Sequence, residues 1–319
     1  MKNTVFVVAA ACALAGLLAS AQQPQPAAGG QQAGQGQRRP PDPQSRGGGD
    51  CRDNPLNCAD APNPLPAATT VWLEEMTWMD VRDAMKAGKT TVIIGTGGIE
   101  PNGPWLALGK HQYVLKANCE AIARKLGNAL CAPLIPLVPE GGIEPKSGHM
   151  TTVGTLSMRE ETFQAMLTDV VTSLKAHGFE NIILIGDSGG NQRGQKEVAE
   201  KLNTQWNGTP VVAHIPEYYD YASVNKAMTE AGAIKESEKG DGLHDDPIIS
   251  LNMFVTDPNS IRYEQRVKAG KATINGVPIA DKAKNAEIGK KIVEFRATKT
   301  VDAIKKAIAA KGKSSTTQP

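Results

Sequence analysis

The sequence lacks an excess of charge of either sign. Its 35 Lys and Arg residues face 33 Asp and Glu residues, which leaves a net charge of +2, and the basic residues are scattered along the chain. Proteins that bind nucleic acid usually gather basic residues on one face or along one helix. The composition therefore gives no indication of a nucleic-acid partner.

Cysteines are few, and no two of them have the C-x-x-C spacing. That spacing is typical of structural zinc sites, so a zinc site built from cysteines is not expected. An even number of cysteines in an exported chain permits disulfides, and four remain once a leader containing Cys12 is removed. Cys51 and Cys58 bracket a short loop and are the more favourable pair. Cys119 and Cys131 either pair or remain as two buried thiols.

No apolar run reaches the length of a comfortable membrane span. The run from Val5 to Leu18 follows Lys2 and precedes an A-x-A site at Ala19–Ala21, which together predict a secretory signal peptide over residues 1–21. A lipoprotein leader ending before Cys12 is the weaker alternative, because its apolar segment would be only about eight residues long. The chain is thus expected to be secreted or periplasmic after cleavage near Ala21.

The remaining chain divides by composition. Residues 22–50 are rich in Gln, Pro and Gly and have almost nothing to bury, which predicts a disordered linker. Residues 51–312 have the size of one α/β domain, and residues 313–319 are predicted to be a disordered tail.

Within the domain, short apolar or β-branched runs alternate with helical patterns. Strands are expected over residues 90–94, 131–138, 181–185 and 210–215, and helices over residues 72–85, 112–126, 159–177 and 192–202. Residues 283–311, rich in Ala and Lys, indicate two helical stretches that cover the surface. The alternation predicts an α/β fold with a mainly parallel sheet and helices on both faces.

Three loops carry residues with chemistry. The first contains Glu100 and His111, and the third contains His244 followed by Asp245 and Asp246. Carboxylates and imidazoles are metal ligands and general bases, although an exposed loop acid or a solvated acidic turn gives the same pattern. His149 is a weaker candidate of this kind, and His177 is expected to be structural.

The second loop, Gly186-Asp-Ser-Gly-Gly190, follows a predicted strand and precedes a predicted helix. It fits the G-x-S-x-G nucleophile elbow, with a triad of Ser188, Asp220 and His244 in chain order. The same residues are also explained if Asp187 and Ser188 only cap the helix that follows.

The sequence resembles the creatininase (creatinine amidohydrolase) family over about residues 76–254. The family's T-W and G-x-x-E-x-H-G-P-H-L-P-L-x-x-D segments are matched by Thr77-Trp78 and by the stretch from Gly97 to His111. Its H-G-F and N-G-H-G-G-N words are matched by His177-Gly-Phe179 and Gly186-Asp-Ser-Gly-Gly-Asn191, and its final H-A-G-E-x-E segment by the stretch that begins at His244.

This resemblance implies an α/β/α sandwich and hydrolysis of C–N bonds, often in cyclic amides, at a two-metal site. It also implies a small-molecule amide substrate and a homo-oligomer. Glu100 matches the family's glutamate, whereas Asn102, His111 and Ser188 replace family ligands.

In the family, an aspartate at the position of His111 bridges the two metal ions. A neutral imidazole cannot bridge two cations as a carboxylate does, so the resemblance with His111 at this position favours a single divalent ion, zinc or alternatively manganese. The expected ligands are Glu100, His111 and Asp187, with Asp246 or His244 as a fourth. His244 is also expected to protonate the leaving nitrogen. Two alternatives remain open: a covalent mechanism at Ser188, and a small-molecule-binding protein without catalysis on the same scaffold.

Overall fold

A computed structural model describes residues 60–236 and 240–315 of the chain, with side chains up to residue 310. The predicted leader, the predicted linker, and Cys51 and Cys58 lie outside the described residues. All elements below belong to the compact unit that begins at Asn63.

The strands of the central sheet are β1 Thr91–Thr96, β2 Ala129–Cys131, β3 Asn181–Gly186 and β4 Val211–His214, and β5 Thr273–Ile274 and β6 Val277–Pro278 form a small antiparallel hairpin. The helices are α1 Trp78–Lys86, α2 Lys110–Leu126, α3 Glu160–Ala176, α4 Gln192–Gln205, α5 Tyr221–Glu230, α6 Pro247–Thr256, α7 Tyr263–Lys268 and α8 Lys282–Ser315.

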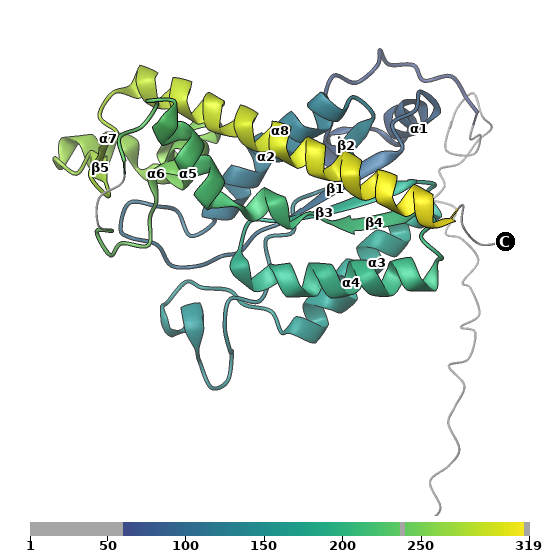
Figure 1. Cartoon of the computed structure of the whole chain (residues 1–319), viewed down its shortest axis with the longest axis horizontal. Coiled ribbons are helices and arrows are strands. Elements are labelled where there is room, and N and C mark those ends of the chain that lie inside the picture. Colours follow the sequence, from purple (N-terminus) through teal and green to yellow (C-terminus); the bar gives the residue numbers. More distant parts are fainter. Residues whose placement is uncertain (1–59, 237–239, 316–319) are drawn as a thin grey trace, which may run out of the picture. The chain divides into compact units, whose positions relative to one another are not determined.

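The central sheet is parallel throughout, with the strand order β2-β1-β3-β4. Alternate residues of each strand enter different cores. Ile93 and Ile183 pack with α2 and α8 on one face, and Ile94 and Leu184 pack with α3 and α4 on the other. Figure 1 shows these helix layers on the two sides of the sheet. The predicted α/β/α sandwich is confirmed.

Helix α1 begins at Trp78, later than the predicted start at residue 72, because Thr77 caps it. The Thr77 hydroxyl accepts a hydrogen bond from the Asp80 backbone, and the Asp80 carboxylate accepts one from the Thr77 backbone N–H. Such a capping box satisfies two N–H groups that a helix start leaves open. The predicted strand over residues 131–138 is wrong in its position. Strand β2 spans Ala129–Cys131 and ends where the prediction begins, because Pro133 and Pro136 lack the N–H groups that a strand needs.

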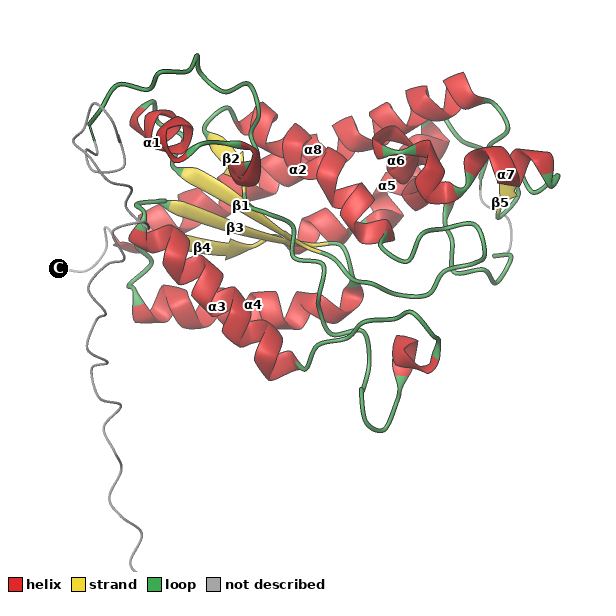
Figure 2. Ribbon diagram, turned by 180° about the vertical axis from the view of Figure 1, so that it is seen from behind, coloured by secondary structure: helices red, strands yellow, loops and turns green. Residues whose placement is uncertain are grey.

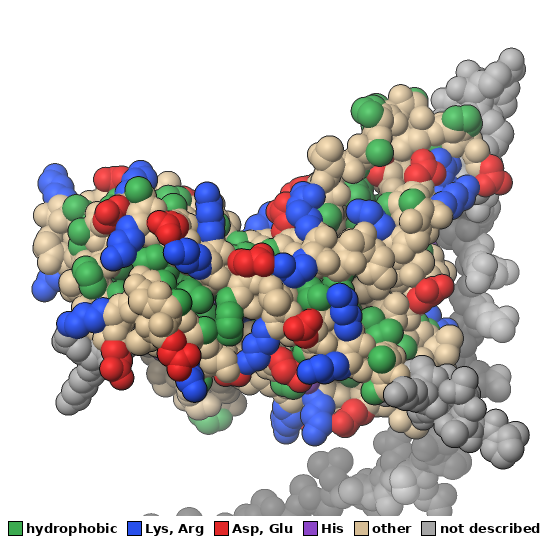
Figure 3. Space-filling model, turned by 45° about the horizontal axis from the view of Figure 1, so that its top comes forward, with side chains coloured by type: hydrophobic (Ala, Val, Ile, Leu, Met, Phe, Trp, Pro, Cys, Tyr) green, Lys and Arg blue, Asp and Glu red, His purple; other side chains and the backbone are tan. Residues whose placement is uncertain are grey.

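The C-terminal part differs from the sequence prediction. Residues 282–315 form one continuous helix, α8, which packs on α2 and α6 and reaches β4 (Figure 2). Its buried face includes Ile292, Arg296 and Ile304, so the prediction of two helices that only cover the surface is wrong. On the outer face of the molecule, acidic and basic side chains are interspersed (Figure 3), as in the ion pair of Glu287 with Lys291.

Cys119 and Cys131 are both buried as free thiols, which was one of the two alternatives for this pair. No helix in the described part of the chain is long and apolar enough to cross a bilayer. The long loop between β2 and α3 projects from the body of the unit and carries a short 3-10 turn, Gly148–Thr151 (Figure 2).

Candidate metal centre

The candidate site lies at the carboxyl ends of β1 and β3. The chain runs from β1 to β2 on one side and returns to β3 on the other, and such a reversal opens a crevice where ligands bind in parallel sheets. A cavity of about 470 Å³ occupies this position. Glu100 enters it from the loop after β1, and Asp187 lies at its base directly after β3, so both predicted residues are brought together.

The loop after β1 holds Glu100 through its backbone. The Glu100 N–H donates to the Leu108 carbonyl at 3.1 Å, and the Asn102 amide donates to the Glu100 carbonyl at 3.1 Å. The Asn102 side chain also donates to the Ala107 carbonyl and so holds the loop together. The Glu100 side chain is only 4% exposed, so its carboxylate needs partners.

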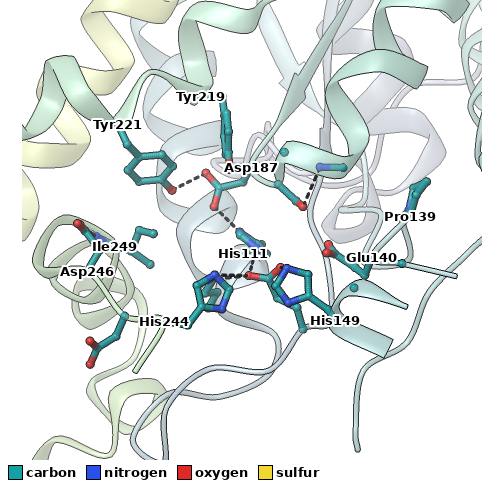
Figure 4. A pocket seen from close by; sticks show the side chains of 18 residues that line it. His111, Pro139, Glu140, His149, Asp187, Tyr219, Tyr221, His244, Asp246 and Ile249 are labelled. Atoms are coloured by element: carbon teal, nitrogen blue, oxygen red, sulfur yellow. Dashed lines mark hydrogen bonds and ion pairs between the residues drawn. The ribbon is translucent and has the colours of Figure 1, made fainter. Parts of the chain in front are cut away.

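Charged side chains form a continuous row across the site, and this row begins at Glu100. His111 Nε2 lies 3.1 Å from Glu100 Oε1, and His111 Nδ1 lies 2.9 Å from Asp187 Oδ2. Because a carboxylate only accepts, Nδ1 carries the hydrogen. Asp187 Oδ1 accepts from Arg296 of α8 at 2.9 Å and from the Tyr221 hydroxyl at 2.7 Å. Figure 4 shows Asp187 between Tyr221 and His111.

Burial and charge oppose each other along this row. Burial alone would raise the pKa of Asp187, but the Arg296 guanidinium and His111 outweigh it and hold that pKa below its usual range. Burial would lower the pKa of His111, and its contacts with Asp187 and Glu100 instead raise it. The Glu100 carboxyl likewise has a lowered pKa despite burial, because His111 and Lys110 stabilise its charge. In this inner part of the site, buried groups of opposite charge therefore stabilise one another.

The outer part of the site contains two histidines that face the solvent. His149 Nε2 lies 3.4 Å from Glu100 Oε2, and His244 Nε2 lies 3.8 Å from Glu100 Oε1. The two rings stack at 5.2 Å between centroids with 13° between their planes. His244 Nδ1 donates to the Pro101 carbonyl at 2.8 Å, which leaves the Nε2 lone pair directed at Glu100. Figure 4 shows both rings at the mouth of the cavity.

Glu140 lines the same cavity and was not found from the sequence. It comes from the long loop before α3 and packs against Gly98, where an added Cβ would lie 1.7 Å from Glu140 Oε1. Burial and the negative charge of Glu100 raise the pKa of Glu140 to about 7. Oε1 is buried and has no hydrogen-bond partner among the described residues. A carboxyl in this state can accept or release a proton near neutral pH.

Two of the predicted site residues have other partners. Asp246 caps α6, since its carboxylate accepts from the backbone N–H groups of Ile248 and Ile249. The Ser188 hydroxyl accepts from the Gly190 N–H at 3.4 Å and caps the short turn that follows.

The triad of Ser188, Asp220 and His244 is not assembled, so that prediction is wrong. The Asp220 carboxylate caps α5 and forms an ion pair with Lys299, while His244 donates to the Pro101 carbonyl. The acid therefore does not orient the histidine as a triad requires.

Two groups of described residues place their ligand atoms within 4.8 Å of one another. The outer group is Glu100, His149 and His244, and the inner group is Glu100, His111 and Glu140. Asp187 and Asp246, which the sequence suggested as ligands, belong to neither group. His149, the weaker candidate in the sequence, belongs to the outer one.

Lys110, Glu140 and Arg296 were missed from the sequence. Lys110 adjoins a predicted ligand, and Glu140 directly precedes a long loop that contains several glycines, and loops of that length are usually functional. No sequence feature marked Arg296 as a site residue, because it stands in a Lys-rich helix far along the chain from its partner Asp187.

Solved structures of creatininases share this fold. A creatininase structure aligns with a TM-score of 0.56 and 17% identity, covering 76% of this chain and 99% of that one. A manganese form aligns with a TM-score of 0.56 and 16% identity over 75% of this chain and 99% of that one. A creatininase variant of the Zn–Zn type aligns with a TM-score of 0.54 and 18% identity, covering 76% of this chain and 99% of that one. No protein among the curated sequences compared with this chain matches it.

The family model of creatininase, described as creatinine amidohydrolase, matches residues 74–316. The match begins just before α1 and extends through α8, so it contains every residue of both candidate metal groups. With most of its length matched, this chain belongs to the creatininase family.

Proposed function

We propose that this protein is a hydrolase of amide C–N bonds that works with a single divalent metal ion held by the outer group, Glu100, His149 and His244. The observation that carries the proposal is the convergence of these three side chains, from three separate loops, on one point at the mouth of a cavity. Each offers an atom of a type that zinc and manganese accept.

The outer group fits a metal ion better than the ligands suggested by the sequence. Its two imidazoles are half-exposed and already turn Nε2 toward Glu100, and one of them is fixed by the Pro101 carbonyl. A backbone carbonyl behind a ligating histidine is a common support of metal sites. Three protein ligands with an open side toward solvent are typical of catalytic zinc.

Asp187 fits a supporting role in this proposal. Both of its oxygens are engaged, one by Arg296 and Tyr221 and the other by His111, and its side chain is fully buried. Coordination would require it to give up either Arg296 or His111, which would leave a buried cation without its counterion.

The bound ion would activate a water molecule and polarise the substrate carbonyl. The protein's own groups supply the rest. Glu140 lines the same cavity as the histidines (Figure 4) and is placed to hold the proton that the water loses and to return it to the leaving nitrogen. His244, which the sequence suggested as the proton donor, is assigned here as a ligand.

The cavity favours a small substrate. Its volume of about 470 Å³ lies at the small end of typical ligand pockets, which run from roughly 300 to 1,000 Å³. Tyr219 forms part of its wall beside charged groups. A creatininase variant with the same fold has been solved in complex with creatine, a small molecule with a C–N framework. These points support a compact amide, linear or cyclic, as the substrate class.

Metal analysis and turnover together test the proposal. Purified protein should bind zinc or manganese and hydrolyse at least one member of a panel of small linear and cyclic amides, and chelation should stop the reaction reversibly. His149→Ala and His244→Ala should each weaken metal binding at least about tenfold. His177→Ala is the matched control, because His177 is an exposed residue at the end of α3 and should change neither property.

Two results would contradict the proposal. A protein that cannot be loaded with either metal has no such centre. Binding of metal and amide without turnover would support the alternative of a non-catalytic binding protein.

A further inference from the structure

Lys110 occupies an unusual place for a lysine. It is the first residue of α2, its side chain is 3% exposed, and it lines the cavity beside the proposed metal ligands. Its Nζ lies 2.6 Å from Glu100 Oε1. Lysine is almost never fully buried unless it is paired, and here the pairing is with the carboxylate that both candidate metal groups share.

The two oxygens of Glu100 have different surroundings. Oε2 faces His149 of the outer group at 3.4 Å. Oε1 faces the Lys110 ammonium at 2.6 Å and His111 at 3.1 Å, and His244 of the outer group lies farther from it, at 3.8 Å. An ion in the inner group of Glu100, His111 and Glu140 would need that same side of the site, and its two positive charges would lie beside the ammonium. Two positive charges at so short a distance in a buried site repel each other strongly.

We propose that the Lys110 ammonium takes the place of a second metal ion, so that this protein binds one divalent ion where creatininases of the two-metal type bind two. The inference rests on the proposed function, which places the one ion in the outer group. In two-metal hydrolases the second ion helps to stabilise negative charge that develops on the substrate. Lys110 supplies a fixed positive charge at the cavity wall for the same purpose.

The charges around the site agree with this inference. The inner carboxylates Glu100 and Asp187 are neutralised by side chains of the protein itself, namely Lys110, His111 and Arg296. A cation carried by the chain is present before any metal arrives and needs no ligand set of its own.

The test is the number of zinc ions that each variant binds, measured by calorimetric titration with ZnCl₂ alone and by elemental analysis after desalting. Wild-type protein should bind one ion per chain. Lys110→Met keeps the length of the side chain and removes its charge, so the inner group of three ligands becomes available and a second ion should bind. Its affinity should be at least about a hundredfold higher than any second binding in the wild type. Lys110→Arg keeps the charge and should still bind one.

Thermal melting of each metal-free variant, followed by circular dichroism, shows whether the variant is folded. The number of zinc ions bound by the wild type can by itself overturn the inference. Two ions in the wild type, or one ion in a folded Lys110→Met variant, overturn it and leave the proposed outer site standing. No ion in the wild type with one in Lys110→Met would support the role of Lys110 but overturn the proposed function. No ion in either protein overturns both.

Discussion

Replacing Arg296 by Met should destabilise the protein strongly, because Asp187 would lose its counterion. The guanidinium donates to Asp187 Oδ1 at 2.9 Å, to the Tyr218 carbonyl at 3.0 Å and to the Tyr221 hydroxyl at 3.0 Å. It also stacks between the rings of Tyr218 and Tyr221. The side chain is 1% exposed and that of Asp187 is 0% exposed, so water cannot replace the lost partner.

The size of the effect follows from this burial. Removing one member of a buried ion pair typically costs about 3–5 kcal/mol, because the remaining charge is left without compensation. For a domain of this size, that corresponds to a fall in melting temperature of roughly 6–20 °C. Without Arg296, burial dominates and the pKa of Asp187 should rise, so the variant should become relatively more stable as the pH falls through that pKa.

Urea denaturation of four proteins measures the pair: the wild type, Arg296→Met, Asp187→Asn and the double variant. Their double-mutant cycle should give a coupling of about 2 kcal/mol or more. Lys299→Met is the control on the same helix. Lys299 is 30% exposed and its partner Asp220 is 39% exposed, so its loss should cost less than about 1 kcal/mol. Equal losses for Arg296→Met and Lys299→Met, or a coupling near zero, would refute the reasoning.

Three further predictions concern the cavity and its rim. In metal-free protein, the raised pKa of Glu140 means that the folded state holds a proton between pH 4.5 and about 7 that the unfolded state releases. Glu140 should therefore reduce the unfolding free energy by about 3 kcal/mol as the pH rises through this window, and Glu140→Gln should remove that part of the slope in urea titrations. Asp246→Ala should cost about 0.5–2 kcal/mol of stability as the loss of a helix cap, while zinc titration should show an unchanged affinity; a large loss of zinc would restore Asp246 as a ligand. Gly98→Ala should fold but push Glu140 out of place and lower kcat by about a hundredfold, and a wild-type kcat would show that Glu140 takes no part.

Much of the fold could be predicted from local patterns. Apolar runs of strand length predicted β1, β3 and β4. These features depend on neighbours in the sequence. The continuity of α8 could not be predicted in the same way, because its Ala- and Lys-rich sequence is compatible with an exposed cover, and only packing against α2 and α6 shows which face is buried.

The site was predicted in part for the same reason. Glu100 and His244 stand in loops whose residue types already indicate chemistry, and both reach the cavity. Asp187, predicted as a metal ligand, lies at the base of the cavity, but its role depends on Arg296, which is 109 residues away in the chain. No local pattern records that the two charges meet, and so the sequence could not show that the carboxylate is already occupied.

The contact between Asp187 and Arg296 also makes the base of the cavity depend on α8. Asp187 follows β3, whereas the guanidinium that compensates its charge is carried by α8. Burying the carboxylate without that partner is unfavourable. A protein truncated before α8 would therefore lack the counterion at the base of its cavity.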